Sequence, residues 1–295
     1  MITINNLEVK YGEEIALQVK TPITFEEGDR IGIIGSNGAG KSTLVKAILG
    51  LINYKGNIRT KLKLTEISAH LQENNYPSTM AVKYVIEGIL GMKIKNNHEL
   101  NDLISFFDFE NCLNKKFSEL SGGQKQRLTI ILVLMQNNQL VFFDEVTSGL
   151  DFETRQNLMN KIIQWYDDKK STICIVSHYY EELDQLANKI LILDKGKVVD
   201  FGYKKALFEK YCGKSIITIE NNIQNKKLAE NFKRILSPEH LIAIPCYTKE
   251  MELEIAKILI NKNVNFKRSD NDIEIMSINA KANYDGGNNN EREVV

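Results

Sequence analysis

One stretch of the chain has the composition of a phosphate-binding loop. The run Gly35-Ser36-Asn37-Gly38-Ala39-Gly40-Lys41-Ser42 fits GxxxxGK[ST] at every fixed position. Glycines let consecutive backbone N–H groups turn inward around a phosphate, and the helix that follows adds its positive N-terminal end. In such a loop Lys41 reaches the β- and γ-phosphates and the Ser42 hydroxyl binds magnesium. We therefore predict a nucleotide-binding loop with the contact residues Gly35, Ser36, Asn37, Gly38, Ala39, Gly40, Lys41, Ser42 and Thr43.

Two acidic residues end an apolar run further along the chain. Asp144 and Glu145 follow Leu140-Val141-Phe142-Phe143. A carboxylate pair is costly to bury unless positive charge lies nearby, and magnesium held by Ser42 would supply that charge. Asp144 is then expected to bind the metal, directly or through water, and Glu145 to polarise the attacking water as general base. Taken alone, the pattern fits solvent-facing acids at a strand end equally well.

A third segment has the composition of a helix start. Leu120-Ser121-Gly122-Gly123-Gln124 precedes a basic and then apolar stretch, and Ser121 is suited to cap the helix. The free N–H groups of this helix end would form a second anion-binding point. A cap without a ligand is the ordinary alternative, so by itself the segment shows nothing about phosphate.

The elements expected around these residues place them at strand and helix ends. Alternating residues predict antiparallel strands over Ile2–Lys10 and Ile15–Phe25. Unbroken apolar runs of strand length are typical of a parallel sheet covered on both faces. Such strands are predicted over Arg30–Ile34, Gln139–Phe143 and Thr172–Val176, with helices over Lys125–Met135 and Phe152–Asp167 and a hairpin over Ile190–Val199.

After about Lys210 the pattern changes to a compact β-α-β-α-β-β unit. Strands are predicted over Ser215–Ile219 and His240–Ile244, helices over Lys226–Leu236 and Thr248–Asn261, and two strands within Val264–Ile278. The stretch Asn283–Val295 holds Gly286-Gly287 and three consecutive asparagines, so we expect a disordered tail there.

The three motifs, in this order, identify a family. GSNGAGKS, LSGGQ and the LVFFDE strand resemble the ATP-binding subunit of ABC transporters over about Ile2–Gly202, most of all the bacterial ABC-2-type or drug- and peptide-export ATPases. LSGGQ separates this family from other phosphate-loop enzymes. The resemblance implies an α/β P-loop NTPase fold with a mostly parallel sheet, an N-terminal antiparallel β subdomain and a helical subdomain. The expected parts are an ATP-binding domain over 1–212 with the helical subdomain at about 73–135, a small α+β accessory domain over 213–282, and a tail over 283–295.

The resemblance also implies roles for weaker motifs. Tyr11 matches the aromatic residue that stacks on adenine, and Gln72 matches the Q-loop glutamine that contacts magnesium and senses the membrane partner. Asp151 lies in the D-loop match, and His178 matches the switch histidine at the γ-phosphate. Each has an ordinary alternative: a strand tyrosine, a loop glutamine, a strand-end histidine. One departure from the family is Val146, which stands where proline is usual.

Further residues fall outside the motifs. His70, His98 and His240 match nothing in the family pattern and are expected to be histidines with satisfied structural contacts.

The family resemblance implies partners that the chain itself lacks. Two such domains pair head to tail in this family, with Ser121, Gly122, Gly123 and Gln124 contacting the ATP held by the other subunit. Because the chain carries one complete motif set, a homodimer is favoured, and a heterodimer stays open. A separate membrane permease is implied as well, with export as the expected direction.

Composition excludes other classes. Lys+Arg and Asp+Glu both total 38, so the formal net charge is zero, which argues against a nucleic-acid binder that relies on a basic field. The longest apolar run is too short to cross a bilayer, and the four cysteines lack metal spacing, so we expect a cytoplasmic protein, peripheral on the cell membrane.

The alternative function is an ATPase of this family that acts on ribosomes or DNA, although no long coiled coil separates the motifs and only one ATP domain is present. A GTPase is disfavoured because Leu191 stands at the aspartate of the guanine-reading NKxD motif.

Overall fold

A ten-stranded mixed sheet forms the centre of the molecule. The computed structural model describes residues 1–72, 74 and 76–290. The strand order is β3-β1-β2-β10-β9-β4-β8-β7-β6, and β5 pairs with β1. The strands are β1 (Ile2–Tyr11), β2 (Glu14–Val19), β3 (Ile23–Phe25), β4 (Arg30–Ile34), β5 (Lys55–Thr60), β6 (Ile67–His70), β7 (Leu140–Asp144), β8 (Thr172–Val176), β9 (Lys189–Asp194) and β10 (Lys197–Tyr203).

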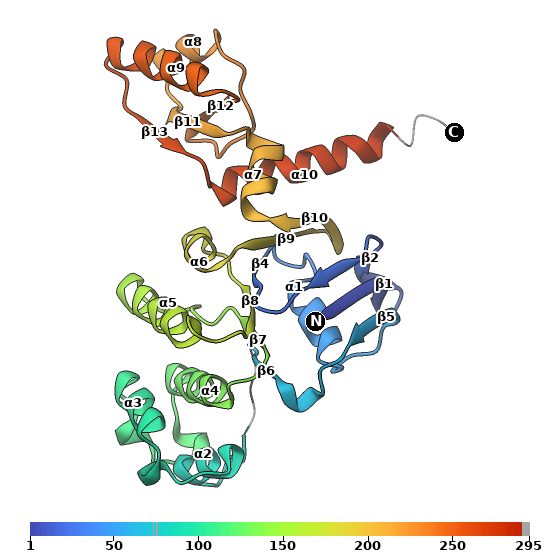
Figure 1. Cartoon of the computed structure of the whole chain (residues 1–295), viewed down its shortest axis with the longest axis vertical. Coiled ribbons are helices and arrows are strands. Elements are labelled where there is room, and N and C mark those ends of the chain that lie inside the picture. The colour runs from blue at the N-terminus through green and yellow to red at the C-terminus, as the bar shows by residue number, and fades with distance from the viewer. Residues whose placement is uncertain (73, 75, 291–295) are drawn as a thin grey trace.

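The parallel half of this sheet is covered by helices on both faces. Strands β6, β7, β8, β4 and β9 are parallel, and every residue of β7 and β8 is buried. Val141 and Phe143 face one apolar core, whereas Leu140 and Phe142 face another, as the two-residue period of a strand requires. The first core is covered by α4 (Gly122–Gln136), α5 (Phe152–Tyr166) and α6 (Tyr180–Leu186), and the second by α1 (Lys41–Ile48). Figure 1 shows these helices on opposite sides of the sheet. The α/β class predicted from the sequence is confirmed.

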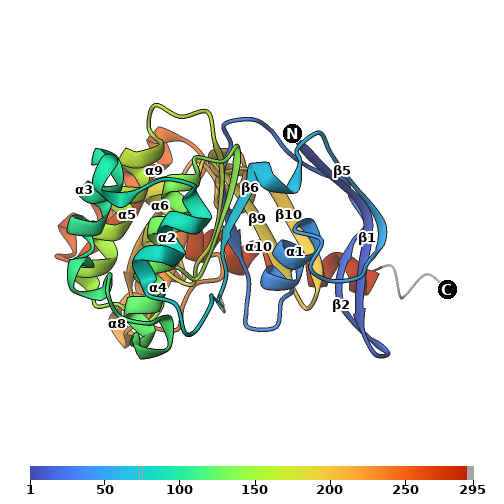
Figure 2. The same ribbon diagram turned by 90° about the horizontal axis from the view of Figure 1, so that it is seen from below.

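The antiparallel and helical parts flank this half. Strands β1, β2, β3 and β5 form the N-terminal antiparallel region, with β1 paired to β2, β3 and β5. The single strand expected over Ile15–Phe25 is instead β2 and β3, because Pro22 has no N–H with which to continue the ladder. Between β6 and α4 the chain forms α2 (Val82–Leu90) and α3 (His98–Phe106), which lie beside α4 in Figure 2. Short 3₁₀ turns join them.

A second, three-stranded sheet forms the C-terminal unit, which we define as residues 215–269. The order is β12-β11-β13, all antiparallel. Its elements are β11 (Ser215–Glu220), α8 (Ile223–Ala229), β12 (Leu241–Cys246), α9 (Lys249–Asn261) and β13 (Phe266–Ser269). Ile217, Ile244 and Leu259 belong to its own apolar core, while Ile216 and Ala243 on the other sheet face join the core of the large sheet.

Three expectations for this region are wrong. Val264–Ile278 holds the single strand β13, and α10 (Ile273–Asn290) follows it in place of a second strand. The apolar residues Ile273, Met276 and Ala280 are all buried at helical spacing, and the Asp272 carboxylate accepts from the backbone N–H of Ile275 at 2.9 Å, which caps the helix.

The helix also replaces part of the expected tail. Residues 283–290 are helical as the end of α10, and 291–295 lie outside the described residues. The helix expected over Lys226–Leu236 ends at Ala229, because Ile235 pairs instead with Ala243 of β12 (N–H to O=C, 3.1 Å).

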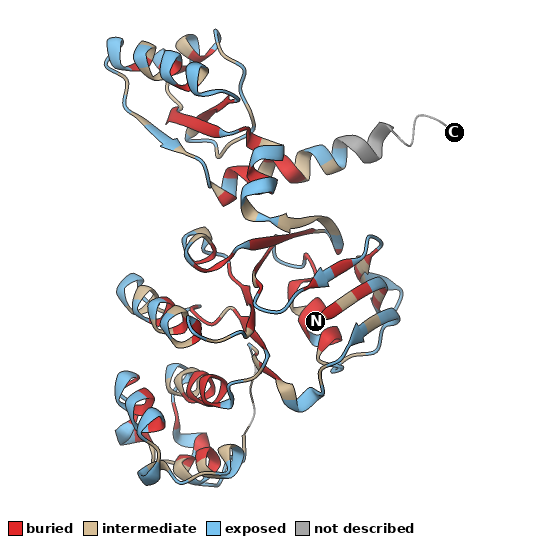
Figure 3. Ribbon diagram, in the orientation of Figure 1, coloured by how far each residue is buried: buried red, intermediate tan, exposed pale blue. Residues whose placement is uncertain are grey.

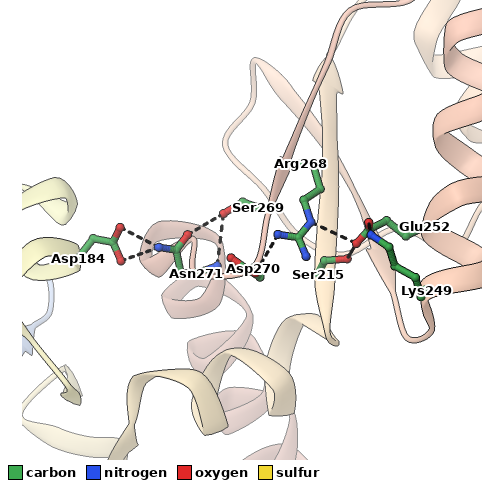
Figure 4. A network of polar contacts seen from close by, with 8 residues as sticks. All are labelled: Asp184, Ser215, Lys249, Glu252, Arg268, Ser269, Asp270 and Asn271. Atoms are coloured by element: carbon green, nitrogen blue, oxygen red, sulfur yellow. Dashed lines mark hydrogen bonds and ion pairs between the residues drawn. The ribbon is translucent and has the colours of Figure 1, made fainter.

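Helices α7 (Lys204–Cys212) and α10 connect the C-terminal unit to the large sheet. Helix α10 packs against α7, α6, β9 and β10, and Figure 3 shows its buried residues in the part of the helix that lies beside α7. A polar contact adds to this apolar packing, since the Asn271 amide donates to both carboxylate oxygens of Asp184 on α6 at 2.9 and 2.8 Å (Figure 4). The segment that directly follows the C-terminal unit is therefore attached to α6, the helix that follows His178.

Candidate nucleotide-binding and hydrolysis site

The phosphate loop lies between β4 and α1, as the sequence predicts. Gly38 and Gly40 adopt positive φ angles of 77° and 96°, a region that L side chains rarely occupy. A Cβ at Gly35 would lie 2.5 Å from the carbonyl oxygen of Leu193, so this position also excludes a side chain. The loop thus turns with its backbone exposed toward the N-terminus of α1, which is the geometry that binds phosphate.

Lys41 lies at the first turn of α1 and is folded onto its own loop. Its ammonium donates to the carbonyl oxygens of Gly35 (2.9 Å) and Ser36 (3.1 Å). Burial lowers the pKa of Lys41, while Glu145 and Asp144 act in the opposite direction. The side chain is 6% exposed, so its charge is held inside the site.

Asp144 ends β7 in a buried position with an incomplete set of contacts. The residue is 2% exposed, and its Oδ1 atom lacks a hydrogen-bond partner among the described residues. Burial raises the pKa of this carboxyl, whereas Ser42 and Lys41 lower it. A buried carboxylate oxygen without a donor is costly, and a cation would relieve that cost.

Glu145 and His178 form a pair at the ends of neighbouring strands. Because β7 and β8 are parallel, Asp144 is level with Val176, and the backbone N–H of Glu145 donates to Val176 O at 2.9 Å. The Glu145 Oε1 and His178 Nε2 atoms are 2.9 Å apart. Glu145 has a φ of 52°, which is strained for a residue with a side chain and is common at functional sites.

A cavity of about 900 Å³ joins most of the predicted residues. It is lined by Tyr11, Gln72, Glu145 and His178 together with the loop from Ser36 to Thr43. Tyr11 is 54% exposed at the end of β1, so its ring is free to stack on a ligand.

A second cavity, of about 500 Å³, lies against the first. Gln72 lines both cavities, and Asp144, Glu145 and Gly122 line the second. Gln72 is therefore placed between the phosphate loop and the helical subdomain.

The second cavity contains a residue that the sequence reasoning assigned wrongly. His70 is 4% exposed, and both of its ring nitrogens lack partners within the described part of the chain. Burial lowers its pKa to about 4, so the imidazole is neutral near pH 7. It was expected to be satisfied, whereas His98 does pair, with Asp102 at 2.8 Å. Helix α4 packs against β6 and helps to cover His70, a contact that sequence spacing alone does not reveal.

The LSGGQ segment begins α4, as predicted. The Ser121 hydroxyl accepts from the Gln124 N–H (3.3 Å), and the Gln124 side chain accepts from the Ser121 N–H (3.1 Å), which together form a capping box. As far as the structure describes the chain, Ser121, Gly123 and Gln124 lie outside both cavities.

Asp151 caps α5 in the same manner. Its carboxylate accepts from Thr154 N–H at 3.0 Å and from the Thr154 hydroxyl at 2.7 Å, and these bonds lower its pKa. In the described residues Asp151 also lies outside the phosphate cavity.

Comparison with known proteins identifies the family. A family model described as ABC transporter matches residues 20–148. The chain is 31% identical over 224 residues to the energy-coupling factor transporter ATP-binding protein EcfA1 of Ureaplasma parvum, a match that covers 70% of this chain and 76% of that protein. The chain belongs to the ABC transporter ATP-binding subunits.

Other relatives of this ABC ATPase include both importers and exporters. It is 29% identical over 248 residues to the methionine import ATP-binding protein MetN of Clostridium tetani (77% of each chain). It is also 29% identical over 232 residues to the Nod factor export ATP-binding protein I of Burkholderia lata (74% of this chain, 76% of that one). Among solved structures, the dimeric bacterial ABC transporter cassette MJ0796 superposes with a TM-score of 0.60 at 25% identity, covering 69% of this chain and 98% of that one.

These comparisons make the chain an ATP-binding and ATP-hydrolysing subunit of a transporter, which confirms that part of the prediction and favours it over a ribosomal or DNA role. Within the residues described for this ABC ATPase, no helix is both long and apolar enough to span a membrane.

Sequence reasoning missed several residues at the mouth of the phosphate cavity. Glu14, Ile15, Ala16 and Lys195 line it next to Tyr11. The turn at Lys195 and Gly196 was visible in the sequence as a hairpin. Its place at the cavity depends on the pairing of β10 with β2, where Gln18 N–H donates to Gly196 O at 2.6 Å.

Proposed function

We propose that this ABC ATPase binds MgATP in the 900 Å³ cavity and hydrolyses it with Glu145 as general base. The observation that carries the proposal is the 2.9 Å pair between Glu145 and His178, on the wall of the cavity that also holds Lys41. Glu145 would accept a proton from the water that attacks the γ-phosphorus, and His178 would contact the γ-phosphate.

The loop residues would bind the rest of the nucleotide. Lys41 now donates to two carbonyl oxygens of its own loop, and it would turn to the β- and γ-phosphates when these arrive. The N–H groups from Gly35 to Thr43 would surround the phosphates, and the exposed Tyr11 ring would stack on adenine.

Magnesium fits the polar groups beside the loop. The Asp144 Oδ1 atom is buried without a partner among the described residues, and Ser42 lies next to that carboxylate. Oxygen ligands of this kind suit Mg²⁺, which would take its remaining ligands from water and the phosphates. Ser42, Gln72 and Asp144 are the residues proposed to hold it, and when bound it would neutralise charge on the phosphate oxygens.

A second subunit would complete the site. Ser121, Gly122, Gly123 and Gln124 begin α4 away from the phosphate cavity of their own chain, so they would contact ATP bound to the neighbouring subunit. Asp151 would act at the same interface. The dimeric MJ0796 cassette supports this arrangement, and a homodimer is favoured because the chain carries each motif.

We propose that the chain is a peripheral subunit with two domains and that it works with a separate permease. We propose an ATP-binding domain over 1–212 with its helical subdomain at about 73–135, and an accessory domain over 213–282 whose last helix packs back onto α7. The helical subdomain would contact the permease at the cytoplasmic face of the membrane.

Export is the proposed direction. The small α+β unit after the ATP-binding domain is the feature that favours it, along with the Nod factor export relatives. Import is the second candidate, because the match to a methionine import protein is as extensive.

The hydrolysis assignment is tested with Glu145→Gln. We expect this variant to bind ATP and to lose steady-state turnover, giving a nucleotide-trapped dimer in gel filtration. Glu153→Gln, an exposed glutamate on α5, is the matched control and should hydrolyse normally. Continued ATP hydrolysis by Glu145→Gln would contradict the general-base role.

The transporter assignment is tested by pull-down from membranes. The tagged full chain, co-expressed with the permease genes of its own organism, should retain a polytopic membrane protein after detergent extraction. Recovery of ribosomes or DNA in its place would reverse the assignment. Reconstitution of that complex in vesicles of known orientation then decides between export and import.

A further inference from the structure

Glu182 is a buried carboxylate that the proposed chemistry does not use. It lies near the start of α6 and is 1% exposed, whereas its neighbour Glu181 is exposed. A buried carboxylate is retained only where hydrogen bonds or a counter-charge compensate its desolvation.

One oxygen of this carboxylate joins two segments of the hydrolysis site. Glu182 Oε2 accepts from the Ser177 hydroxyl at 2.6 Å and from the Thr147 hydroxyl at 3.0 Å. Ser177 directly precedes His178, and Thr147 follows Glu145 by two residues. Both hydroxyl residues are buried, so water does not compete for these bonds.

The segment that carries Glu145 needs such an anchor. The φ angle of Glu145 is 52°, in a region that is strained for a residue with a side chain, and such a conformation persists only where neighbouring groups fix it. Val146 follows Glu145 directly, so the backbone here has no pyrrolidine ring to restrain it. The Gln126 side chain holds one side by donating to Val146 O at 2.5 Å, and Glu182 holds the other through Thr147.

A cation lies near the second oxygen of this carboxylate, Oε1, which has no hydrogen-bond partner among the described residues. The guanidinium of Arg155 on α5 lies over the Tyr179 ring at 3.7 Å, and its Nη1 is 4.0 Å from Glu182 Oε1. Burial raises the pKa of Glu182, while Ser177, Thr147 and Arg155 lower it. The carboxylate therefore contacts α5 as well as the ends of β7 and β8.

We propose that Glu182 is a positioning residue for ATP hydrolysis, which holds the Glu145 segment and the His178 segment at the separation that forms their 2.9 Å pair. The inference rests on the proposed roles of Glu145 and His178. Within the described residues, Glu182 does not line the phosphate cavity. Its hydrogen bonds there go to Thr147 and Ser177, and not to the side chains of Glu145 or His178.

The test compares Glu182→Ala, Glu182→Gln and Glu181→Ala in the full chain. Glu182→Ala should lower kcat roughly tenfold to hundredfold, because small displacements of catalytic groups have effects of this size, with Kd for ATP and KM changed less than about twofold. Glu182→Gln keeps an oxygen that accepts from both hydroxyls and should recover most of the kcat. Glu181→Ala is the matched control on the same helix and should behave as the parent.

Thr147→Val and Ser177→Ala keep the proposal testable if Glu182→Ala does not fold. Each removes one hydroxyl, and each should lower kcat without a matching loss of ATP affinity. Where Glu182→Ala folds, a Thr147→Val/Glu182→Ala double variant should lose no more kcat than Glu182→Ala alone, since both changes remove the same bond.

Three results would overturn the proposal. These are parental kcat in folded Glu182→Ala, parental kcat in both hydroxyl variants, or a loss of ATP affinity as large as the loss of kcat. Measuring Glu145→Gln in the same experiment distinguishes a failure of the proposed function from a failure of the role of Glu182. If it still turns over, the proposed function fails. If it is inactive while Glu182→Ala is fully active, only the role of Glu182 fails.

Discussion

Asp144 in the ATP-binding domain and Glu252 in the C-terminal unit are both buried carboxylates, but their surroundings differ. Glu252 accepts from the Lys249 ammonium, from Ser215 Oγ at 2.5 Å and from Arg268 Nε at 3.2 Å (Figure 4). The Lys249 and Ser215 bonds, with Arg268, hold the pKa of Glu252 at about 2. Asp144 has one oxygen without a partner among the described residues and a pKa raised by burial.

The contrast distinguishes a buried carboxylate that stabilises the fold from one that is suited to bind a ligand. The cluster around Glu252 is complete, so it stabilises the fold that contains it. One oxygen of Asp144 has no donor among the described residues, and the free-energy cost of burying it is compensated only when a ligand binds. The two carboxylates should therefore respond in opposite ways to the loss of their charge.

The largest expected effect is that of Asp144→Asn. ATP hydrolysis should fall by roughly 10²–10³, because the charge beside the phosphates is lost. Without nucleotide the variant should be more stable than the parent by about 1 kcal/mol, since an amide is cheaper to bury than an uncompensated carboxylate. A steady-state ATPase assay measures the loss of hydrolysis, and chemical denaturation with and without MgATP measures the change in stability. A less stable nucleotide-free protein would contradict the comparison.

Glu252→Ala should produce the reverse pattern. Removal of the carboxylate leaves Ser215 Oγ and Arg268 Nε without their acceptor and should destabilise the C-terminal unit by roughly 1–3 kcal/mol. ATPase activity at a temperature where the variant is folded should stay within about twofold of the parent. The control is Glu254→Ala, an exposed residue of the same helix, which should change neither quantity.

The ionisation of Glu252 should also contribute to the pH dependence of the free energy of unfolding. The folded-state pKa of Glu252, about 2, is below its ordinary value of 4.5. The stabilisation is then present above pH 4.5 and is lost as the pH falls toward 2. Denaturation of the parent and of Glu252→Gln across this range should converge at the acid end. Parallel curves would show that Glu252 does not titrate as stated.

The smallest expected effect concerns the contact between the two regions. Asn271→Ala removes two hydrogen bonds to Asp184 at an exposed site and should cost about 0.5–1.5 kcal/mol. Lys204 still binds Asp184 at 2.8 Å, and α10 still packs on α7, so the unit should stay attached. Hydrogen exchange should rise in β13 and α6, with exposed Asn261→Ala as the control. Unchanged exchange in both elements would show that the contact is not needed.

The phosphate loop and the strand-end acids could be predicted because their chemistry is local. GxxxxGK[ST] determines its own backbone path, and buried parallel strands are visible as unbroken apolar runs. The C-terminal region was predicted less well. Ile273-Glu274-Ile275 reads as an alternating strand, yet Asp272 caps a helix there, and the choice depends on α7 as a packing partner. His70 was missed for a similar reason, since its burial comes from α4, more than 50 residues away in sequence.

The sequence by itself determined the fold class, the phosphate loop, the two acids at the end of β7 and the family to which they belong. These features depend on residue types and on short spacings that any folded form of the chain must respect. The tertiary structure decided which residues meet: Glu145 with His178, Gln72 between two cavities, and Glu182 between Thr147 and Ser177. Apart from the bond between Glu182 and Ser177, these contacts join positions that are distant in the sequence. They are set by strand order and helix packing, because the net free energy of burial is decided by the whole core at once.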